Sequence, residues 1–133
     1  MWNVFQSIGV FDKVKSKGSL KHYQKKLQNI RENEGDVLID MGVLCLDEEK
    51  FDESLIYLEK ARQIYLELDE KEAEAFVVDL IGDVYISMRD IDKALFQYQK
   101  SFRLYASVRS SMKDELLEKI KEAEDIKEAM DIR

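Results

Sequence analysis

The order of apolar and polar residues is typical of amphipathic helices, and it repeats after 40 positions. Residues 34–68 and 74–108 superpose when the sequence is shifted by that distance. In each block, one run of apolar residues at intervals of three and four is followed by a polar break, at 47–50 or 87–90, and then by a second apolar run. The pattern therefore predicts one helical hairpin in each block.

A glycine marks the same position in both blocks. Gly42 and Gly82 fall in the middle of the predicted first helices, where glycine costs about 1 kcal/mol relative to alanine. The second helices carry pairs of small residues seven positions apart on one face, Ser54 with Ala61 and Ala94 with Ser101. We expect each glycine to lie opposite this small-residue face, because two helices can then pack closely.

These positions resemble the tetratricopeptide repeat family, in which a large apolar residue, Leu-Gly and Tyr mark the first helix and Ala, a bulky residue and Ala mark the second. The positions that carry the resemblance are Leu38, Met41, Gly42, Cys45, Ser54, Leu58 and Ala61, and then Val78, Ile81, Gly82, Tyr85, Ala94, Tyr98 and Ser101. The blocks lack the signature Trp and Pro, and their 40-residue period is similar to that of a subgroup with extended helices. The resemblance implies an all-α fold of antiparallel helical hairpins stacked as a short right-handed α-solenoid.

The segments that flank the two blocks are also predicted to be helical. Residues 2–32 resemble a degenerate first hairpin, in which Gly18 and Ser19 supply a break and a candidate N-cap. Residues 111–131 have one apolar and one densely charged face, which predicts a C-terminal capping helix at the end of the solenoid. We therefore expect residues 1–133 to form a single TPR-like domain.

Composition supports a helical chain and limits the classes of partner. The sequence contains no proline, which breaks helix interiors, and only five glycines. Its net charge is −7, and residues 1–34 contribute +4, so the rest of the chain carries −11. An acidic body repels phosphate groups, and binding to nucleic acid is therefore not expected.

The sequence offers no candidate for a catalytic or metal site. His22 has no Ser or Cys placed beside it as a nucleophile, and Cys45 stands where the family usually has a core tyrosine. The acidic run at 47–53 lacks the ligand spacing and the central glycine of a calcium-binding loop. We therefore expect a non-catalytic protein with no metal and no cofactor.

A membrane location is not expected either. No apolar run approaches the roughly 20 residues that span a bilayer. The first residues also lack the basic start and the apolar stretch of a secretory signal. These observations lead us to expect a cytoplasmic protein.

The family resemblance implies a concave groove that is lined mainly by the first helix of each hairpin. By that analogy the groove is lined by Asp36, Ile39, Asp40, Val43, Asp47, Phe76, Asp79, Leu80, Asp83 and Ile86. Because acidic and apolar residues alternate, this groove would suit a basic, amphipathic peptide or helix. The alternative is that the aspartates only keep the surface soluble, while Ile39, Val43 and Leu80 belong to the core. The groove lacks the Lys, Asn and Arg with which some members of the family bind acidic chaperone tails.

Two functions remain open from the sequence. The leading hypothesis is a protein–protein interaction scaffold that binds a basic, amphipathic segment of a partner in the acidic-apolar groove. The alternative is a self-associating structural subunit, such as a homodimer, whose N-terminal helix docks on a neighbouring chain. It rests on the apolar residues near the N-terminus, which could equally cap their own solenoid: Met1, Trp2, Val4, Phe5, Ile8 and Phe11.

Overall fold

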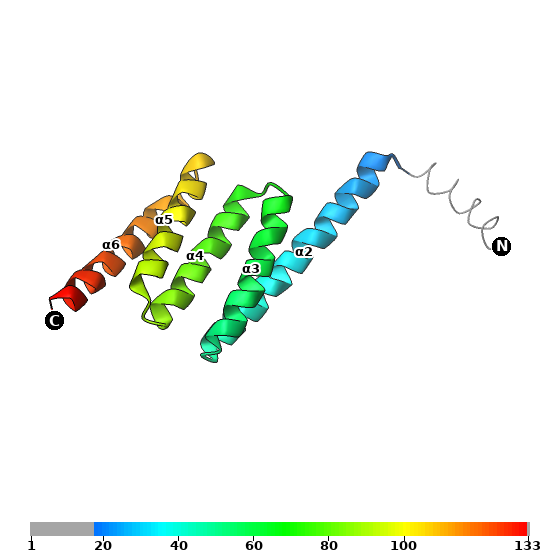
Figure 1. Cartoon of the computed structure of the whole chain (residues 1–133). Helices are drawn as coiled ribbons and strands as arrows, with labels where there is room; N and C mark the ends of the chain where they lie inside the picture. Colours follow the sequence, from blue (N-terminus) through cyan, green and yellow to red (C-terminus); the bar gives the residue numbers. More distant parts are fainter. Residues whose placement is uncertain (1–17, 133) are drawn as a thin grey trace. The chain divides into compact units, whose positions relative to one another are not determined.

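The computed structural model describes residues 18–132, and that part of the chain is almost entirely helical (Figure 1). It contains no strand, and its helices are α2 (Leu20–Asp47), α3 (Phe51–Glu67), α4 (Lys71–Ser87), α5 (Ile91–Ser107) and α6 (Met112–Asp131). Helices α4 and α5 form the second predicted hairpin, and α6 is the predicted C-terminal helix. The prediction of an all-α fold is confirmed.

The chain divides into two units, residues 1–31 and residues 32–133. The described part of the first unit consists of Gly18, Ser19 and the first half of α2. The Ser19 side-chain oxygen accepts a hydrogen bond from the backbone N–H of His22 at 3.4 Å, as an N-cap residue does. In the second unit, α3 packs on α4, α4 on α5 and α5 on α6, which is the consecutive order of a helical repeat.

One expected boundary between helices is absent. The sequence suggested that a first hairpin ends at residue 32 and that a repeat begins at 34, whereas α2 runs from Leu20 to Asp47 without a break. This stretch contains no proline, so its backbone hydrogen bonds continue from one turn to the next. The other half of the expected first hairpin, residues 2–17, lies outside the described residues.

Two clusters of buried side chains form the core of the second unit. The cluster around α3 and α4 consists of Leu58, Ala61, Tyr65, Val77, Ile81 and Val84. The cluster around α4, α5 and α6 consists of Ala75, Ile91, Ala94, Leu95, Tyr98, Tyr105, Leu116 and Ala123. Helix α4 contributes to both clusters, so it is the central element of the packed repeats.

The two mid-helix glycines make room for large side chains. A Cβ atom on Gly42 would lie 2.6 Å from Cγ of Leu58, and one on Gly82 would lie 2.6 Å from Cδ1 of Tyr98. Gly42 does lie against the small-residue face of α3, where Ser54 bonds its carbonyl, but the side chains closest to the two glycines are Leu58 and Tyr98. The residue that needs the space is the bulky one between the two small ones.

The small serines of the second helices bond the backbone of the first helices. The Ser54 hydroxyl donates to the carbonyl of Gly42 at 2.7 Å, and the Ser101 hydroxyl donates to the carbonyl of Ala75 at 2.6 Å. Both serines are fully buried. A buried hydroxyl with a partner avoids the cost of an unsatisfied polar group, so these bonds fix how closely the paired helices approach.

All four turns between the described helices have the same geometry. One residue in each turn has a positive φ, and these residues recur every 20 positions: Glu49, Asp69, Arg89 and Arg109, with φ of 59°, 56°, 62° and 56°. The N–H of the next residue donates to a carbonyl five positions back, for example Asp90 to Tyr85 at 2.9 Å. This is the left-handed C-terminal stop of a helix, a position that glycine usually occupies.

Replacing a turn residue by glycine is therefore expected to stabilise the protein. In Arg89→Gly the left-handed strain on a residue with a Cβ is removed, so the free energy of unfolding should rise by about 0.5–1 kcal/mol. Urea denaturation followed by helical circular dichroism measures this change. The matched control is Arg103→Gly in the middle of α5, which should lower the same free energy by about 1 kcal/mol. A loss of stability in both variants would contradict the assignment of strain to Arg89.

Adding a methyl group at a mid-helix glycine is expected to destabilise the protein. Alanine is the better helix former, yet in Gly82→Ala its Cβ would collide with the Tyr98 ring and should cost about 1–3 kcal/mol. Urea denaturation of Gly82→Ala, Tyr98→Ala and the double variant forms a cycle that isolates this contact. We expect the penalty of Gly82→Ala to disappear in the Tyr98→Ala background. If Gly82→Ala lowers the free energy of unfolding equally in both backgrounds, the destabilisation does not come from a collision with the Tyr98 ring.

Candidate functional site

Two of the predicted groove residues, Asp79 and Asp83, lie one helical turn apart on α4 and share a cation from α6. The ammonium nitrogen of Lys119 is 2.9 Å from Oδ1 of Asp79 and 3.2 Å from both carboxylate oxygens of Asp83. The hydroxyl of Tyr98 donates to Oδ1 of Asp83 at 2.6 Å, and the Lys119 nitrogen lies 5.8 Å from the centre of the Tyr98 ring. The four side chains form one polar cluster, here called the Lys119 cluster.

Within the Lys119 cluster, partial burial and the neighbouring charges shift the pKa values of Asp79 and Lys119 in opposite directions. Burial raises the pKa of Asp79, although the hydrogen bond and charge of Lys119 act to lower it. For Lys119, burial acts to lower the pKa, but its bonds to and attraction by Asp79 and Asp83 outweigh this and raise it. Burial, followed by the bond to Asp83, also raises the pKa of the Tyr98 hydroxyl. Lys119 therefore stays charged, and the charges of this aspartate pair are partly compensated within the chain.

Asp36, another predicted groove residue, is bonded to α3. The Tyr65 hydroxyl donates to a carboxylate oxygen of Asp36 and lies 3.4 Å from the backbone carbonyl of Glu32. Gly35 lies against the Tyr65 ring, where a Cβ would come within 2.7 Å of Cζ. Burial raises the pKa of the Tyr65 hydroxyl, and the bond to Asp36 adds to this, so the phenol stays protonated and acts as a donor.

The predicted aliphatic groove residues are all at least partly buried. Ile39 and Leu80 pack against the core cluster around α3 and α4, and Ile86 packs against the cluster around α4, α5 and α6. Val43 is half-buried. By contrast, Asp40 and Asp47 are exposed on α2. The accessible part of the predicted set is thus mainly acidic.

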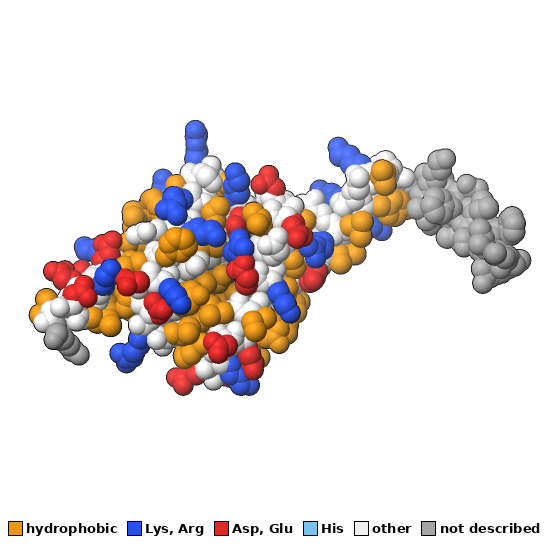
Figure 2. All heavy atoms as spheres, viewed as in Figure 1, with side chains coloured by type: hydrophobic (Ala, Val, Ile, Leu, Met, Phe, Trp, Pro, Cys, Tyr) orange, Lys and Arg blue, Asp and Glu red, His pale blue; other side chains and the backbone are white. Residues whose placement is uncertain are grey.

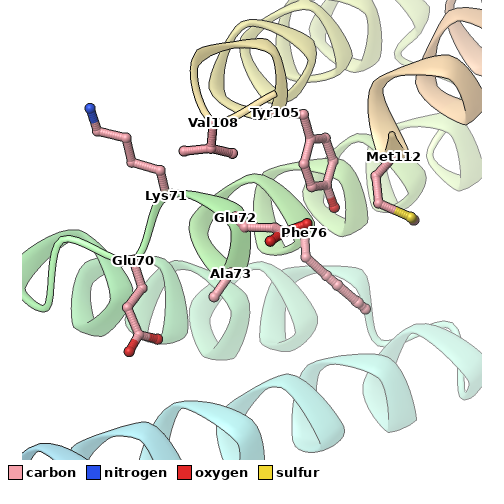
Figure 3. A pocket seen from close by; sticks show the side chains of 8 residues that line it. All are labelled: Glu70, Lys71, Glu72, Ala73, Phe76, Tyr105, Val108 and Met112. Atoms are coloured by element: carbon pink, nitrogen blue, oxygen red, sulfur yellow. The ribbon is translucent and has the colours of Figure 1, made fainter. Parts of the chain in front are cut away.

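Phe76, the predicted aromatic groove residue, opens into a hollow of about 680 Å³ where α4 begins, α5 ends and α6 begins (Figure 3). Its lining consists of Glu70, Lys71, Glu72, Ala73, Phe76, Tyr105, Val108 and Met112. In Figure 3 the side chain of Lys71 points away from Phe76, Tyr105 and Met112. The hollow therefore has an apolar floor with carboxylates beside it.

The carboxylate of Glu72 is fixed at the edge of this hollow. The hydroxyl of Ser110, in the turn before α6, donates to Oε1 of Glu72 at 2.7 Å. Burial raises the pKa of Tyr105 to about 12, with smaller contributions from Asp79 and Glu72, so the phenol in the hollow is neutral. The hollow combines an uncharged aromatic surface with negative charge, which is the chemistry that attracts amphipathic cations.

Several of these residues were not among the predicted groove residues. Lys119 lies in the C-terminal helix, 40 residues after Asp79, and its ion pair with Asp79 depends on the packing of α6. Tyr98 was predicted only as the bulky residue of the repeat motif, and its hydroxyl bond to Asp83 depends on the packing of α5 against α4. Glu70, Glu72 and Met112 carry no periodic signal, because the hollow forms where three helix ends meet.

The described residues also bear on other classes of site. Among them, no group of three or more His, Cys, Asp or Glu side chains is arranged to hold a metal ion. Cys45 is buried, with its sulfur 4.0 Å from a carboxylate oxygen of Glu53. No helix in residues 18–132 has the length and apolar character to cross a membrane. Lys, Arg, Asp and Glu side chains are instead interspersed over the face shown in Figure 2.

Comparison with known proteins finds the same repeat. Residues 33–107 match the family model described as tetratricopeptide repeat. The chain is also 31% identical over 78 residues to the uncharacterized protein ycf37 of Guillardia theta. That alignment covers 59% of this chain and 43% of the relative, so the chain spans less than half the length of the protein it matches.

The matched family has a known general role. Tetratricopeptide repeats generally mediate protein–protein interactions and are non-catalytic. The matched residues include both glycine-centred hairpins, from the second half of α2 to the end of α5. By its repeat pattern, its packed helical hairpins and this match over more than half its length, the chain belongs to the tetratricopeptide repeat family.

Proposed function

We propose that this protein is a non-catalytic scaffold that binds a basic, amphipathic segment of a partner protein. The observation that carries this proposal is the hollow around Phe76, with its apolar floor and its flanking carboxylates Glu70 and Glu72. An apolar side chain of the partner would contact Phe76 and Met112, and neighbouring Lys or Arg residues would meet the carboxylates. Aromatic anchors of this kind often dominate the affinity of a binding surface.

The Lys119 cluster illustrates the same chemistry within the chain. Lys119 belongs to an amphipathic helix, and its ammonium group binds two carboxylates and lies over an aromatic ring. Because Lys119 already engages Asp79 and Asp83, the proposed partner contact lies at the Phe76 hollow. Reversing the charge of the Asp79 pair would disturb this internal contact as well as binding, so Phe76 is the cleaner site for mutation.

Binding to a basic amphipathic helix is expected to depend on Phe76. The probe is a fluorescein-labelled peptide of Leu, Lys and Arg with helical periodicity, and its affinity is measured by fluorescence anisotropy. Phe76→Ala should weaken binding about tenfold, because the apolar anchor is lost. The matched control is Phe96→Ala, which removes another exposed aromatic residue, on α5, and should leave the affinity unchanged.

The charge dependence provides a second criterion for this proposal. Affinity for the basic peptide should fall as salt concentration rises, because the carboxylates beside the hollow are accessible to ions. A peptide with Glu in place of Lys and Arg should not bind. Equal binding of the acidic peptide, or equal losses in Phe76→Ala and Phe96→Ala, would count against a site at the hollow.

A further inference from the structure

Helix α6 is held by fewer buried side chains than α5, the helix on which it packs. Two of its 20 residues, Leu116 and Ala123, are buried, whereas α5 buries six of its 17 residues. Ile120 packs against the same core cluster, but Leu117 and Met130 stay 49% and 53% exposed. Because the burial of apolar surface is the main source of stability, α6 depends on its polar contacts more than α5 does.

Lys119 makes the main polar contact of α6. Its ammonium nitrogen lies 2.9 Å from Asp79 and 3.2 Å from Asp83, both on α4. A second ion pair joins Lys127 to Asp92 of α5 at 2.8 Å, but these side chains are 47% and 75% exposed. An ion pair so open to water contributes little to stability. The attachment of α6 therefore depends largely on one charged side chain.

The remaining charge of α6 has the wrong sign for α4. Helix α6 contains eight acidic and four basic side chains, a net charge of −4, and α4 contains four acidic and one basic, a net charge of −3. Glu115 and Glu122 stand one turn before and one turn after Lys119. Burial is the main cause of the raised pKa of Asp79, and repulsion by Glu115 adds to it, although Lys119 acts in the opposite direction. Apart from Lys119, the charges of α6 are thus a poor match for the aspartates.

The face of α4 and α5 that α6 covers, here called the α6-covered face, has two requirements. Its core cluster accepts apolar side chains at the three- and four-residue spacing of Leu116, Ile120 and Ala123. Its aspartate pair accepts a cation at the position of Lys119. An amphipathic helix with Lys or Arg in place of Glu115 would meet both requirements without the repulsion.

We propose that α6 is an autoinhibitory occupant of the α6-covered face, and that a basic, amphipathic helix of a partner protein binds there in its place. The partner presents apolar residues three and four positions apart, with a Lys or Arg where α6 has Lys119. The match to the tetratricopeptide repeat ends at residue 107, so both helices that form this face lie within the matched residues and α6 lies beyond them. Release of α6 therefore leaves both glycine-centred hairpins complete.

The α6-covered face is separate from the Phe76 hollow. Asp79, Asp83 and Tyr98 do not line that hollow. Helix α6 contributes one residue to its lining, Met112, so the exchange of α6 also alters one wall of the hollow. Binding at the α6-covered face does not depend on binding at the hollow.

The loosening of α6 alone provides the first test. In Lys119→Glu the contact with the aspartates becomes repulsive, so the backbone amides of α6 should exchange with deuterium about tenfold faster or more, while those of α3 keep their protection. Hydrogen exchange followed by mass spectrometry measures this on the full chain. The matched control Lys121→Glu makes the same charge change at an exposed position of α6 and should exchange as the wild type does.

Two results would contradict a separable α6. Equal exchange in Lys119→Glu and Lys121→Glu would show that Lys119 does not hold the helix. Equally faster exchange in all the measured helices would show that α6 cannot leave without the unfolding of the repeats.

Displacement of α6 from the wild-type chain is the second test. The probe is a synthetic peptide of residues 111–132 that carries Glu115→Lys, Glu118→Lys and Glu122→Lys, a basic form of α6. At saturating concentration it should speed the exchange of the chain's own α6 amides about tenfold or more, because it takes their place on α5. A control peptide that also carries Lys119→Glu should leave this exchange unchanged.

The variant Phe76→Ala separates the two surfaces in the same experiment. The basic peptide should displace α6 from this variant as it does from the wild type, because Phe76 is not part of the α6-covered face. An α6 that stays protected in the wild type at saturating peptide overturns the proposal. Displacement that disappears in Phe76→Ala also overturns it, because the peptide would then act through the hollow.

Discussion

The contact between a glycine of one helix and a bulky side chain of the next sets the geometry of both hairpins. Leu58 fills the space over Gly42, and Tyr98 fills the space over Gly82. The helices can approach this closely only where the first helix has no side chain, and a buried serine hydroxyl then reaches the opposite backbone at 2.6–2.7 Å. The close approach brings the Tyr98 hydroxyl to Asp83, so the polar cluster on α4 depends on the same contact.

The turns extend this geometry along the chain. Because each of α2, α3, α4 and α5 is followed by one residue in the left-handed conformation, and these residues recur every 20 positions, the four described turns reverse the chain in the same way. Uniform turns and uniform helix spacing allow α4 to pack on α3 and on α5 at once. The next helix, α6, then brings Lys119 to the two aspartates of α4, one repeat length behind it in sequence.

The first and last described helices differ in how the apolar residues beside them are covered. At the C-terminal side, α6 covers apolar residues of α5 and compensates the charges of Asp79 and Asp83. At the N-terminal side, α2 exposes the residues whose counterparts on α4 are buried.

The sequence alone determined the helical class, the two hairpins, the capping helix and the family, because these depend on local periodicity and on glycine positions that repeat after 40 residues. Only the tertiary structure decided which acidic residues are engaged, since Asp79, Asp83 and Asp36 find their partners on other helices. It likewise decided that Ile39 and Leu80 pack on the core and that three helix ends form the Phe76 hollow. These features depend on contacts between distant residues, which no local pattern specifies.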